Sequence, residues 1–327
     1  MRKINWGVLG TAYIFERDTA EGMRQAENCC LYAIAGRNPG KVRAFQEKYG
    51  FQKAYNSYEA LLADPEVEAV YIPLPNTMHL EWTLKALQAK KHVLCEKPLA
   101  PTAEEAKRMF DAARENGVFL MEAFAYQHSP FIAAVKAELD RGTIGDVRYV
   151  ETALITSDYD MSNIRMRRET LGGSAYDLGV YCVSFIQRML GREPERVKAI
   201  ANFSPEHIDL YTAAILEYEN GLRANLDCGM VLATERNSAL DRFQIHGTLG
   251  SIQSVNFGYN APGNLQYRVR TFDGRGEVIT VPTPHNYRLE VEQLGRCVLG
   301  LETPAVTEAF SLANARTLDR ILETIGY

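Results

Sequence analysis

The feature that most constrains the fold is the regular alternation of short apolar strand patterns and helical patterns over the first 121 residues. The strand patterns include residues 4–10, 31–35, 67–72 and 92–96, and residues 118–121 form the sixth strand. Six strands separated by helical stretches are typical of a doubly wound parallel sheet with helices on both faces. We therefore predict an α/β domain of the Rossmann type over residues 1–122.

The first strand pattern runs directly into a turn of small residues. The turn is Gly7-x-x-Gly10-Thr11-Ala12, and residues 13–25 can continue as a helix. In such a turn, backbone N–H groups and the helix amino terminus bind a pyrophosphate. Alanine stands where the usual fingerprint has its second glycine, so this pattern taken alone fits a plain turn equally well.

The second strand pattern ends in Gly36 and Arg37. In NAD-binding folds this position, about twenty residues beyond the glycines, usually holds an acid that binds the ribose hydroxyls. An acid would repel a 2′-phosphate, whereas a guanidinium pairs with it bidentately. The arginine therefore favours NADP over NAD. The alternative reading of Arg37 is an exposed loop arginine.

The strand pattern at 92–96 ends at Lys97, directly before Pro98. Proline stops the strand and favours an extended backbone at the residue before it, so the ammonium projects from the carboxyl end of the sheet. Open α/β sheets bind their ligands at that edge. Without such a context, a lysine before a proline is usually a surface charge.

A further turn at the same edge covers residues 73–79, and Asn76 or Thr77 can cap the helix that follows it. His79 lies on the first turn of that helix. There it faces either the ligand or, as a partly exposed helix histidine, the solvent.

The second half of the chain has a different pattern. From Arg196 onward strands predominate, Asn220-Gly221 predicts a two-residue hairpin turn, and two helices close the chain at about 287–299 and 308–325. We predict an α+β domain over residues 123–327 with a large, mostly antiparallel open-faced sheet. Its uncovered face is a natural surface for a homodimer or a dimer of dimers.

The second domain also carries a pair of polar residues at helical spacing. Gly172-Gly173 leads into a helical pattern in which Asp177 and Tyr181 are four residues apart, so a carboxylate and a phenol share one face. Among so many apolar neighbours, a tyrosine is more often a core residue whose hydroxyl is satisfied locally.

Composition excludes several functions. The chain has 327 residues with a net charge of -5, so there is no basic surface for nucleic acid and no polybasic membrane patch. No apolar run is long enough for a signal peptide or a membrane span. The six cysteines show no metal-ligand spacing. We expect a cytoplasmic protein without a metal site.

Taken together, the four motifs resemble one known family along the whole chain. Gly7-x-x-Gly10-x-Ala12, Pro75-Asn76-x-x-His79, Glu96-Lys97-Pro98 and Gly172-Gly173 before Asp177-x-x-x-Tyr181 appear in order. This combination is similar to the glucose–fructose oxidoreductase, inositol dehydrogenase and rhizopine catabolism (Gfo/Idh/MocA) family. Within it, the chain most resembles the dimeric dihydrodiol dehydrogenase and NADP-dependent D-xylose dehydrogenase branch.

The resemblance implies a cofactor site and its residues. By position, the turn at Gly10 meets the pyrophosphate, Arg37 the adenosine phosphate, and Glu96 and Lys97 the nicotinamide ribose. The full set of cofactor-binding residues implied by the resemblance is Gly10, Thr11, Ala12, Arg37, Leu74, Asn76, His79, Glu96, Lys97, Arg165 and Tyr287. NADP is the expected cofactor, with NAD possible.

The same resemblance implies hydride transfer to or from a hydroxyl carbon of a sugar, polyol or cyclic diol. Such a reaction needs a group that takes and returns a proton. Tyr181 is the expected acid and base, with Lys97 stabilising its phenolate and Asp177 orienting substrate and lysine. The loops at 157–168, 230–237 and 259–264 are expected to select the substrate.

Two alternatives remain open for the function. A dinucleotide-binding regulator would keep the glycine turn and Arg37 but would need neither Lys97 nor Tyr181. An NAD-dependent enzyme that cleaves glycosides by a redox-assisted route would release a sugar without net reduction of the cofactor.

Overall fold

The chain forms two compact units in the computed structural model, which describes residues 2–157, 163–231 and 239–327. The first unit comprises Met1–His128 and Pro284–Ser311, and the second comprises Ser129–Thr283 and Leu312–Tyr327. The predicted domains, 1–122 and 123–327, place residues 284–311 in the second domain. The contacts within the chain instead group that segment with the first unit.

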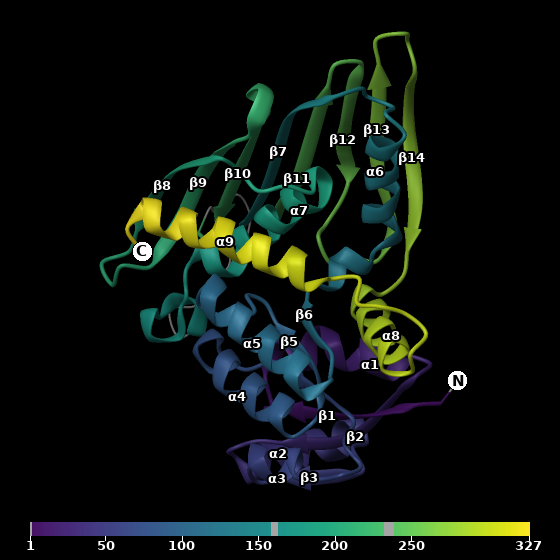
Figure 1. The fold of residues 1–327 in the computed structure, drawn as a ribbon, viewed down its shortest axis with the longest axis vertical. Coiled ribbons are helices and arrows are strands. Elements are labelled where there is room, and N and C mark those ends of the chain that lie inside the picture. Colours follow the sequence, from purple (N-terminus) through teal and green to yellow (C-terminus); the bar gives the residue numbers. More distant parts are fainter. Residues whose placement is uncertain (1, 158–162, 232–238) are drawn as a thin grey trace. The chain divides into compact units, whose positions relative to one another are not determined.

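The first unit contains a parallel sheet of six strands, as the alternating pattern predicts (Figure 1). Every neighbouring pair in the sheet is parallel. The strand order reverses between β1 and β4, which places the ligand edge of a doubly wound fold at the carboxyl ends of these strands. In spatial order the strands are β3 (Lys53–Tyr55), β2 (Cys29–Ala35), β1 (Ile4–Leu9), β4 (Ala69–Ile72), β5 (His92–Glu96) and β6 (Leu120–Ala123).

Helices connect these strands and cover the sheet. Because the strand order reverses, right-handed crossovers place the helices that follow β1 and β2 on one face of the sheet and those that follow β4 and β5 on the other. One helix from late in the chain, α8 (Asn286–Val298), packs against α1. The others are the π-helical turn η1 (Phe15–Thr19), α1 (Ala20–Gln25), α2 (Pro39–Tyr49), α3 (Tyr58–Leu62), α4 (Asn76–Gln88), α5 (Ala103–Asn116) and the 3₁₀ turn η2 (Ala125–His128).

Capping side chains fix where three of these helices, α2, α3 and α5, begin. The side chains of Ser57 and Thr102 accept hydrogen bonds from the backbone of α3 and α5. The prediction that Asn76 or Thr77 caps α4 is wrong. The helix begins at Asn76, and its cap position is Pro75, which has no side-chain acceptor.

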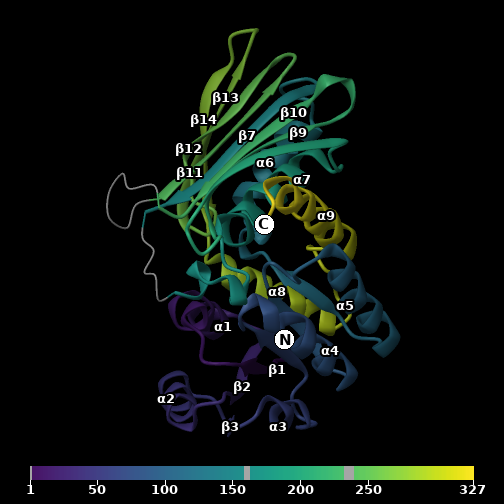
Figure 2. The ribbon, with the colours of Figure 1, turned by 90° about the vertical axis from the view of Figure 1, so that its left-hand side faces the viewer.

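The second unit contains an eight-stranded, mostly antiparallel sheet (Figures 1 and 2). Among the described strands of this sheet, only the neighbours β7 and β10 run parallel. In spatial order the strands are β14 (Gly276–Thr283), β13 (Gly263–Thr271), β12 (Gly250–Asn256), β11 (Ala239–Gly247), β7 (Val147–Thr156), β10 (Arg223–Gly229), β9 (Asp209–Glu217) and β8 (Arg196–Phe203).

One face of this sheet carries the helices. The helix α6 (Pro130–Asp140) packs on β13 and β14, and α7 (Val180–Leu190) packs on β7 and β10. The remaining elements of the unit are the 3₁₀ turns η3 (Ile164–Met166), η4 (Arg168–Thr170) and η6 (Glu219–Gly221), the π-helical turn η5 (Ala175–Gly179), and the part of α9 (Glu308–Ile325) from residue 312 onward.

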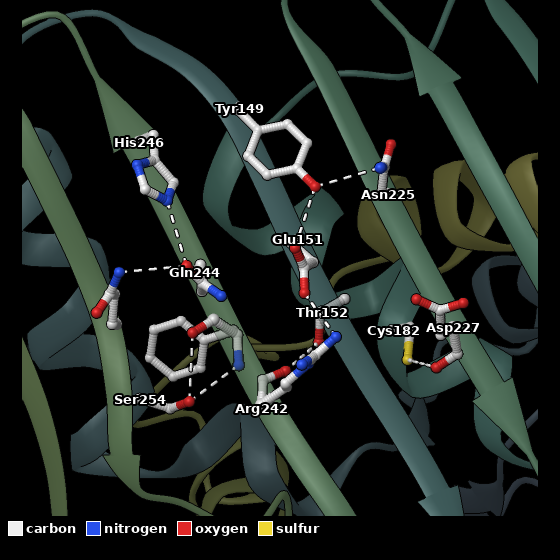
Figure 3. A network of polar contacts seen from close by, with 12 residues as sticks. Tyr149, Glu151, Thr152, Cys182, Asn225, Asp227, Arg242, Gln244, His246 and Ser254 are labelled. Atoms are coloured by element: carbon white, nitrogen blue, oxygen red, sulfur yellow. Dashed lines mark hydrogen bonds and ion pairs between the residues drawn. The ribbon is translucent and has the colours of Figure 1, made fainter.

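Polar side chains cover the other face of the sheet. Asn225 donates to the hydroxyl of Tyr149 at 3.2 Å, Tyr149 donates to Glu151 at 3.1 Å, and Arg242 pairs with Glu151 at 2.8 Å (Figure 3). Strand neighbours of these residues share their face, which places the exposed Ile215 beside Asn225. The alternation of buried and polar positions confirms the open-faced sheet.

The hairpin between β9 and β10 is as predicted, but its turn is not. The connection is the three-residue turn Glu219–Gly221, in which both Asn220 (φ 58°) and Gly221 (φ 74°) are left-handed. Tyr218 pairs with Leu222 across it through a 2.9 Å backbone hydrogen bond. The Asn-Gly dipeptide supplies the left-handed residues, while the preceding Glu219 lengthens the loop by one residue.

None of the helices in the described ranges is long and apolar enough to cross a membrane.

Candidate functional site

The turn after β1 forms a close-fitting cradle of small residues. Gly10 has φ of 116°, which favours glycine, and a Cβ there would lie 3.1 Å from the Leu74 side chain. A Cβ at Gly36 would lie only 2.8 Å from Val42. Thr11 and Ala12 are half-buried between this strand end and the first helical residues. A turn with no room for larger side chains fits the close approach of a dinucleotide pyrophosphate.

Arg37 is exposed at the carboxyl end of β2, beside Tyr58 at the start of α3. Burial raises the pKa of Tyr58, and the Arg37 guanidinium partly offsets that rise. The Tyr58 hydroxyl also lies 3.8 Å from the position that a Cβ of Gly10 would take. Tyr58 was not identified from the sequence. The feature that could have revealed it is Ser57, a capping residue that starts a short helix at the ligand edge.

Buried hydrogen bonds fix the side chain of Glu96, the last residue of β5, which directly precedes Lys97. Tyr71 donates to Glu96 Oε1 at 2.6 Å, and the Thr19 hydroxyl lies 3.0 Å from the Tyr71 hydroxyl. Burial, together with the Glu96 carboxylate, raises the pKa of Tyr71, so the phenol keeps its proton and donates. The backbone N–H of Lys97 donates to Glu96 Oε2 at 3.3 Å, and the Lys97–Pro98 peptide is cis.

His79 connects the two turns at this edge. It is fully buried, with Nδ1 2.8 Å from the Pro98 carbonyl oxygen and Nε2 2.8 Å from the Leu74 carbonyl oxygen. Burial lowers the pKa of His79, the two carbonyls oppose this, and the Lys97 charge lowers it further. A neutral imidazole donates to one of the two carbonyls, so its hydrogen bond holds one of the two loops that carry Leu74 and Pro98 while the ring lies against the other. A direct contact of His79, or of the half-buried Asn76, with the cofactor stays a prediction.

Two further buried carboxyl groups surround the Lys97 segment. Glu122 is 2% exposed and accepts a hydrogen bond from the Leu99 N–H at 2.9 Å; burial raises its pKa to about 7. Glu290 of α8 is fully buried, and neither of its oxygens has a hydrogen-bond partner among the described residues. Burial, reinforced by the Glu96 charge, raises the pKa of Glu290 well above its usual range. Sequence reasoning missed both residues.

Tyr287 lies one turn before Glu290 on α8 and is buried. A Cβ at Gly22 of α1 would lie 2.7 Å from the Tyr287 carbonyl carbon, so the two helices approach as closely as a glycine allows. The predicted contact of Tyr287 with the cofactor is not tested by these packing relations.

In the second unit, Arg165 and Asp177 form an ion pair. Arg165 Nε donates to Asp177 Oδ2 at 2.7 Å, and both side chains are partly exposed. Asp177 lies in the π-helical turn η5 that leads into α7. Two residues that the sequence analysis assigned to different tasks, cofactor binding and substrate orientation, are thus direct neighbours.

Tyr181 lies on the first turn of α7 and is half-buried. The side-chain amide of Asn260 donates to its hydroxyl at 3.2 Å, and the ring of Tyr259 lies 5.5 Å from its ring. Tyr181 is therefore a tyrosine with a polar contact at its hydroxyl and with access to solvent. Its neighbours come from the 259–264 loop, the one predicted specificity loop that is wholly described. The other two loops include residues 158–162 and 232–238, which lie outside the described residues.

A buried aspartate anchors the turn that carries Asp177 and Tyr181. Asp209 Oδ2 accepts hydrogen bonds from Ser174 Oγ (2.7 Å), the Ala175 N–H (2.7 Å) and Thr212 Oγ1 (2.8 Å). Burial raises the pKa of Asp209, and these three donors oppose the rise. Asp209 was not identified from the sequence, because its partners Ser174 and Ala175 are more than thirty residues away along the chain.

The fold and both sets of residues define a dinucleotide-dependent oxidoreductase, and two family models match the chain accordingly. Residues 4–124 match the oxidoreductase family with an NAD-binding Rossmann fold, and residues 132–253 match the GFO/IDH/MocA C-terminal domain. The chain belongs to the Gfo/Idh/MocA family of NAD(P)-dependent dehydrogenases and reductases, which act on CH–OH groups.

Several similar proteins cover nearly the whole chain. A D-xylose 1-dehydrogenase (NADP(+)) from Haloferax volcanii is 34% identical over 98% of this chain and 96% of its own length. A trans-1,2-dihydrobenzene-1,2-diol dehydrogenase from Xenopus laevis is 30% identical over 98% of both chains. Both activities belong to the branch that the motifs resemble, which confirms that prediction.

A solved structure shows the same fold. The 3-ketoreductase KijD10 from Actinomadura kijaniata, crystallised with NADP and TDP-benzene, superimposes with a TM-score of 0.91. It is 29% identical and covers 99% of this chain and 98% of its own.

Proposed function

We propose that this protein is an NADP-dependent oxidoreductase that transfers a hydride between the nicotinamide and a hydroxyl or carbonyl carbon of a sugar, polyol or cyclic diol. Membership of the family supplies the reaction class. The substrate class is supported by relatives named for D-xylose and for a cyclic diol.

The first unit offers the residues that would hold the dinucleotide. The small-residue turn at Gly10 would meet the pyrophosphate, and Arg37 with its neighbour Tyr58 would meet the 2′-phosphate. When bound, the nicotinamide accepts or gives up the hydride. The remaining residues proposed to contact the cofactor are Thr11, Ala12, Leu74, Asn76, His79, Glu96, Lys97, Arg165 and Tyr287.

The observation that carries the proposed mechanism is the hydrogen bond that the Tyr181 hydroxyl accepts from Asn260. When the carbon that bears a hydroxyl gives up a hydride to the nicotinamide, the hydroxyl oxygen must lose its proton, and Tyr181 is proposed to take that proton. A free phenol has a pKa of about 10, so work near pH 7.5 needs about 3 to 4 kcal/mol of preference for the phenolate. Groups that donate hydrogen bonds or carry positive charge near the phenol supply that preference.

Lys97 is proposed to supply the positive charge at the same carbon–oxygen bond. The Glu96 carboxylate, which accepts a hydrogen bond from the Lys97 N–H, and the His79 contact to the Pro98 carbonyl fix its backbone. Asp177, which is paired with Arg165, is proposed to orient substrate hydroxyls.

A direct assay tests this function. NADP and NAD reduction, followed at 340 nm against a panel of aldoses, inositols and cyclic diols, should show turnover with at least one class and a preference for NADP. Release of sugar from a glycoside without net cofactor reduction would instead identify redox-assisted glycoside cleavage. Tight NADP binding with neither activity would identify a regulator.

We also propose that two copies associate through the open face of the sheet as a homodimer, or four as a dimer of dimers. The face carries both signs of charge, Glu151 and Arg242, and exposed aliphatic side chains at Ile200 and Ile215. A symmetric pair of such faces can place each charge opposite its complement.

A further inference from the structure

Asn260 lies on the connection between β12 and β13, in a segment that is fixed by its neighbour Tyr259. The Tyr259 hydroxyl lies 2.6 Å from Thr152 Oγ1 of β7, and its backbone N–H donates to Asp241 Oδ2 at 3.1 Å. Tyr259 is 3% exposed, and its ring packs 5.1 Å from the ring of Phe257. Asn260 is therefore held by a buried residue attached to the sheet, although it lies in a loop.

The amide of Asn260 has only one of its two ends engaged. Nδ2 donates to the Tyr181 hydroxyl at 3.2 Å. Oδ1 is buried and has no hydrogen-bond partner among the described residues. Leaving a buried acceptor without a donor is costly, so an amide placed here for stability alone would use both ends. The contact with Tyr181 is the polar interaction that this side chain makes.

Other titratable groups in this part of the unit lie on the helical segment of Tyr181, on the β12–β13 connection, and on β10 and β11, where Asp227 and Asp241 both act on the adjacent Cys182. On its own helical segment, Asp177 is paired with Arg165, and burial raises the pKa of Cys182 to about 12. On the β12–β13 connection the neighbour is Tyr259 itself. On β11, burial raises the pKa of Asp241 to about 6, so it is ionised above neutral pH. Against these acidic groups, Asn260 is a neutral donor directed at the phenol oxygen.

We propose that Asn260 is a positioning residue for the reaction: its amide N–H fixes the phenol oxygen of Tyr181 and stabilises the negative charge that develops there when the proton leaves. The inference rests on the proposed function of Tyr181. A hydrogen-bond donor to the charged form of an acid favours that form. No bond to Asn260 is made or broken, and the proton passes between substrate oxygen and Tyr181.

Two measurements test the role of Asn260. The first is the pH dependence of kcat/KM for substrate oxidation between pH 6 and 10 in the wild type, Asn260→Leu and Asn260→Asp. Leucine removes the donor and aspartate adds a negative charge. We expect the rising limb of the profile to move to higher pH by about one unit for leucine, a tenfold loss below the midpoint, and further for aspartate. The plateau at high pH should be retained.

The second measurement needs no substrate. Phenolate absorbance near 295 nm is titrated in each protein and in its Tyr181→Phe derivative, and the difference isolates Tyr181. The midpoint pH of the Tyr181 titration should be higher in Asn260→Leu than in the wild type, and higher still in Asn260→Asp. The control is Gln88→Leu, at an exposed glutamine at the end of α4, and it should leave both curves in place. If Asn260→Leu fails to fold, Asn260→Ser takes its place.

Unchanged curves in the Asn260 variants would overturn the proposal. A shift to lower pH would also overturn it, because it would mean that the phenol donates to the amide oxygen and is held in its neutral form. The Asn260 variants could show the expected rise in the Tyr181 midpoint in a protein that turns over no compound of the substrate panel. That result would leave the contact of Asn260 with Tyr181 intact and would count against the proposed function.

Discussion

At the scale of single residues, the proposed chemistry depends on which oxygen and nitrogen atoms hold a proton at neutral pH. Tyr181 has a donor at its hydroxyl, and the nearest side chain to Lys97 along the chain, Glu96, is already occupied by hydrogen bonds from Tyr71 and the backbone. These hydrogen bonds fix Glu96 directly before the lysine that is proposed to act on a substrate oxygen or a phenolate.

Replacing Tyr181 by phenylalanine removes the proposed acid and base and leaves the ring. Turnover should fall by about 10²- to 10⁴-fold, the usual contribution of general acid–base catalysis, while the Kd for NADPH stays unchanged. Lys97→Ala should lower turnover and also weaken NADPH binding. Fluorescence titration and steady-state rates measure both quantities. Normal turnover in Tyr181→Phe would show that the acid–base assignment is wrong.

Arg37 should decide between the two dinucleotides. Removing a charge-assisted contact to a phosphate costs about 1.5 to 3 kcal/mol, so Arg37→Ala should raise the Kd for NADP by about 10- to 150-fold and leave that for NAD unchanged. The control is Arg43→Ala, at an exposed arginine of α2. An equal loss for both dinucleotides would argue against a 2′-phosphate contact.

The places of single residues in the fold could be predicted where the ends of strands decide them, while their roles stay predictions. Lys97 and Arg37 follow strands, and a strand's end shows in the sequence as an apolar run that stops. The buried contacts of His79 could not be predicted, because both carbonyls that it meets lie in loops whose path depends on the fold. The burial of Glu122 and Glu290 likewise depends on the fold, so the sequence alone does not distinguish them from ordinary surface carboxylates.

At the scale of elements, the π-helical turn η5 and helix α7 carry the proposed catalytic phenol, and Gly173 sets their start. Gly173 has φ of 109°, and a Cβ there would lie 2.0 Å from Asp209 Oδ1. The glycine therefore allows the aspartate to reach Ser174 and Ala175. The direction of Tyr181 depends on this buried contact between β9 and the turn.

Gly173→Ala should consequently be costly. A left-handed alanine costs about 1 to 2 kcal/mol, and the clash with Asp209 adds about 1 to 3 kcal/mol. Gly191→Ala is a matched control, since Gly191 is also left-handed (φ 66°) but has no atoms within 4 Å of its Cβ position. Urea unfolding should show a clearly larger loss for Gly173→Ala. Equal losses would mean that Asp209 moves aside freely.

Most elements could be predicted from local patterns. Strand and helix periodicities, the caps at Ser57 and Thr102 and the Asn220-Gly221 hairpin all depend on residues close together in the chain. The errors arose where a choice between near-equal local options was settled by packing. The three-residue turn at Glu219–Gly221 and the uncapped start of α4 are of this kind.

At the scale of the whole molecule, Glu122 makes stability depend on pH. Its pKa rises from 4.5 to about 7 on folding, so the folded state favours the protonated form. The resulting stability is fully present below about pH 4.5 and is lost as the pH rises towards 7. A difference of about 2.5 pKa units corresponds to a free energy on the order of 3 kcal/mol.

Glu122→Gln removes this titration. As the pH rises from 5 to 8, the free energy of unfolding of the variant should increase relative to that of the wild type. The increase should approach about 3 kcal/mol and is measured by urea unfolding. Glu115→Gln, at an exposed position of α5, is the control and should change little between the two pH values. A constant difference between wild type and Glu122→Gln across the range would show that Glu122 ionises alike in both states.

Association through the open sheet face is testable by mass. The 36.7 kDa chain should run at twice or four times that value in light scattering. Ile200→Lys and Ile215→Lys place charges on the face at positions 72% and 42% exposed and should release the monomer. Leu301→Lys, an exposed leucine of the first unit, should not. A wild type that is monomeric at micromolar concentration would contradict the proposed dimer.

The return of residues 284–311 to the first unit has a consequence for how the protein is made. Helix α8 covers α1 at Gly22 with side chains that are fully buried, Val291 and Leu294 among them. During synthesis, the nucleotide-binding half must wait until helix α8, which ends at Val298, has emerged from the ribosome before its last layer is in place. Until then the nucleotide-binding half exposes an apolar surface that a chaperone can bind.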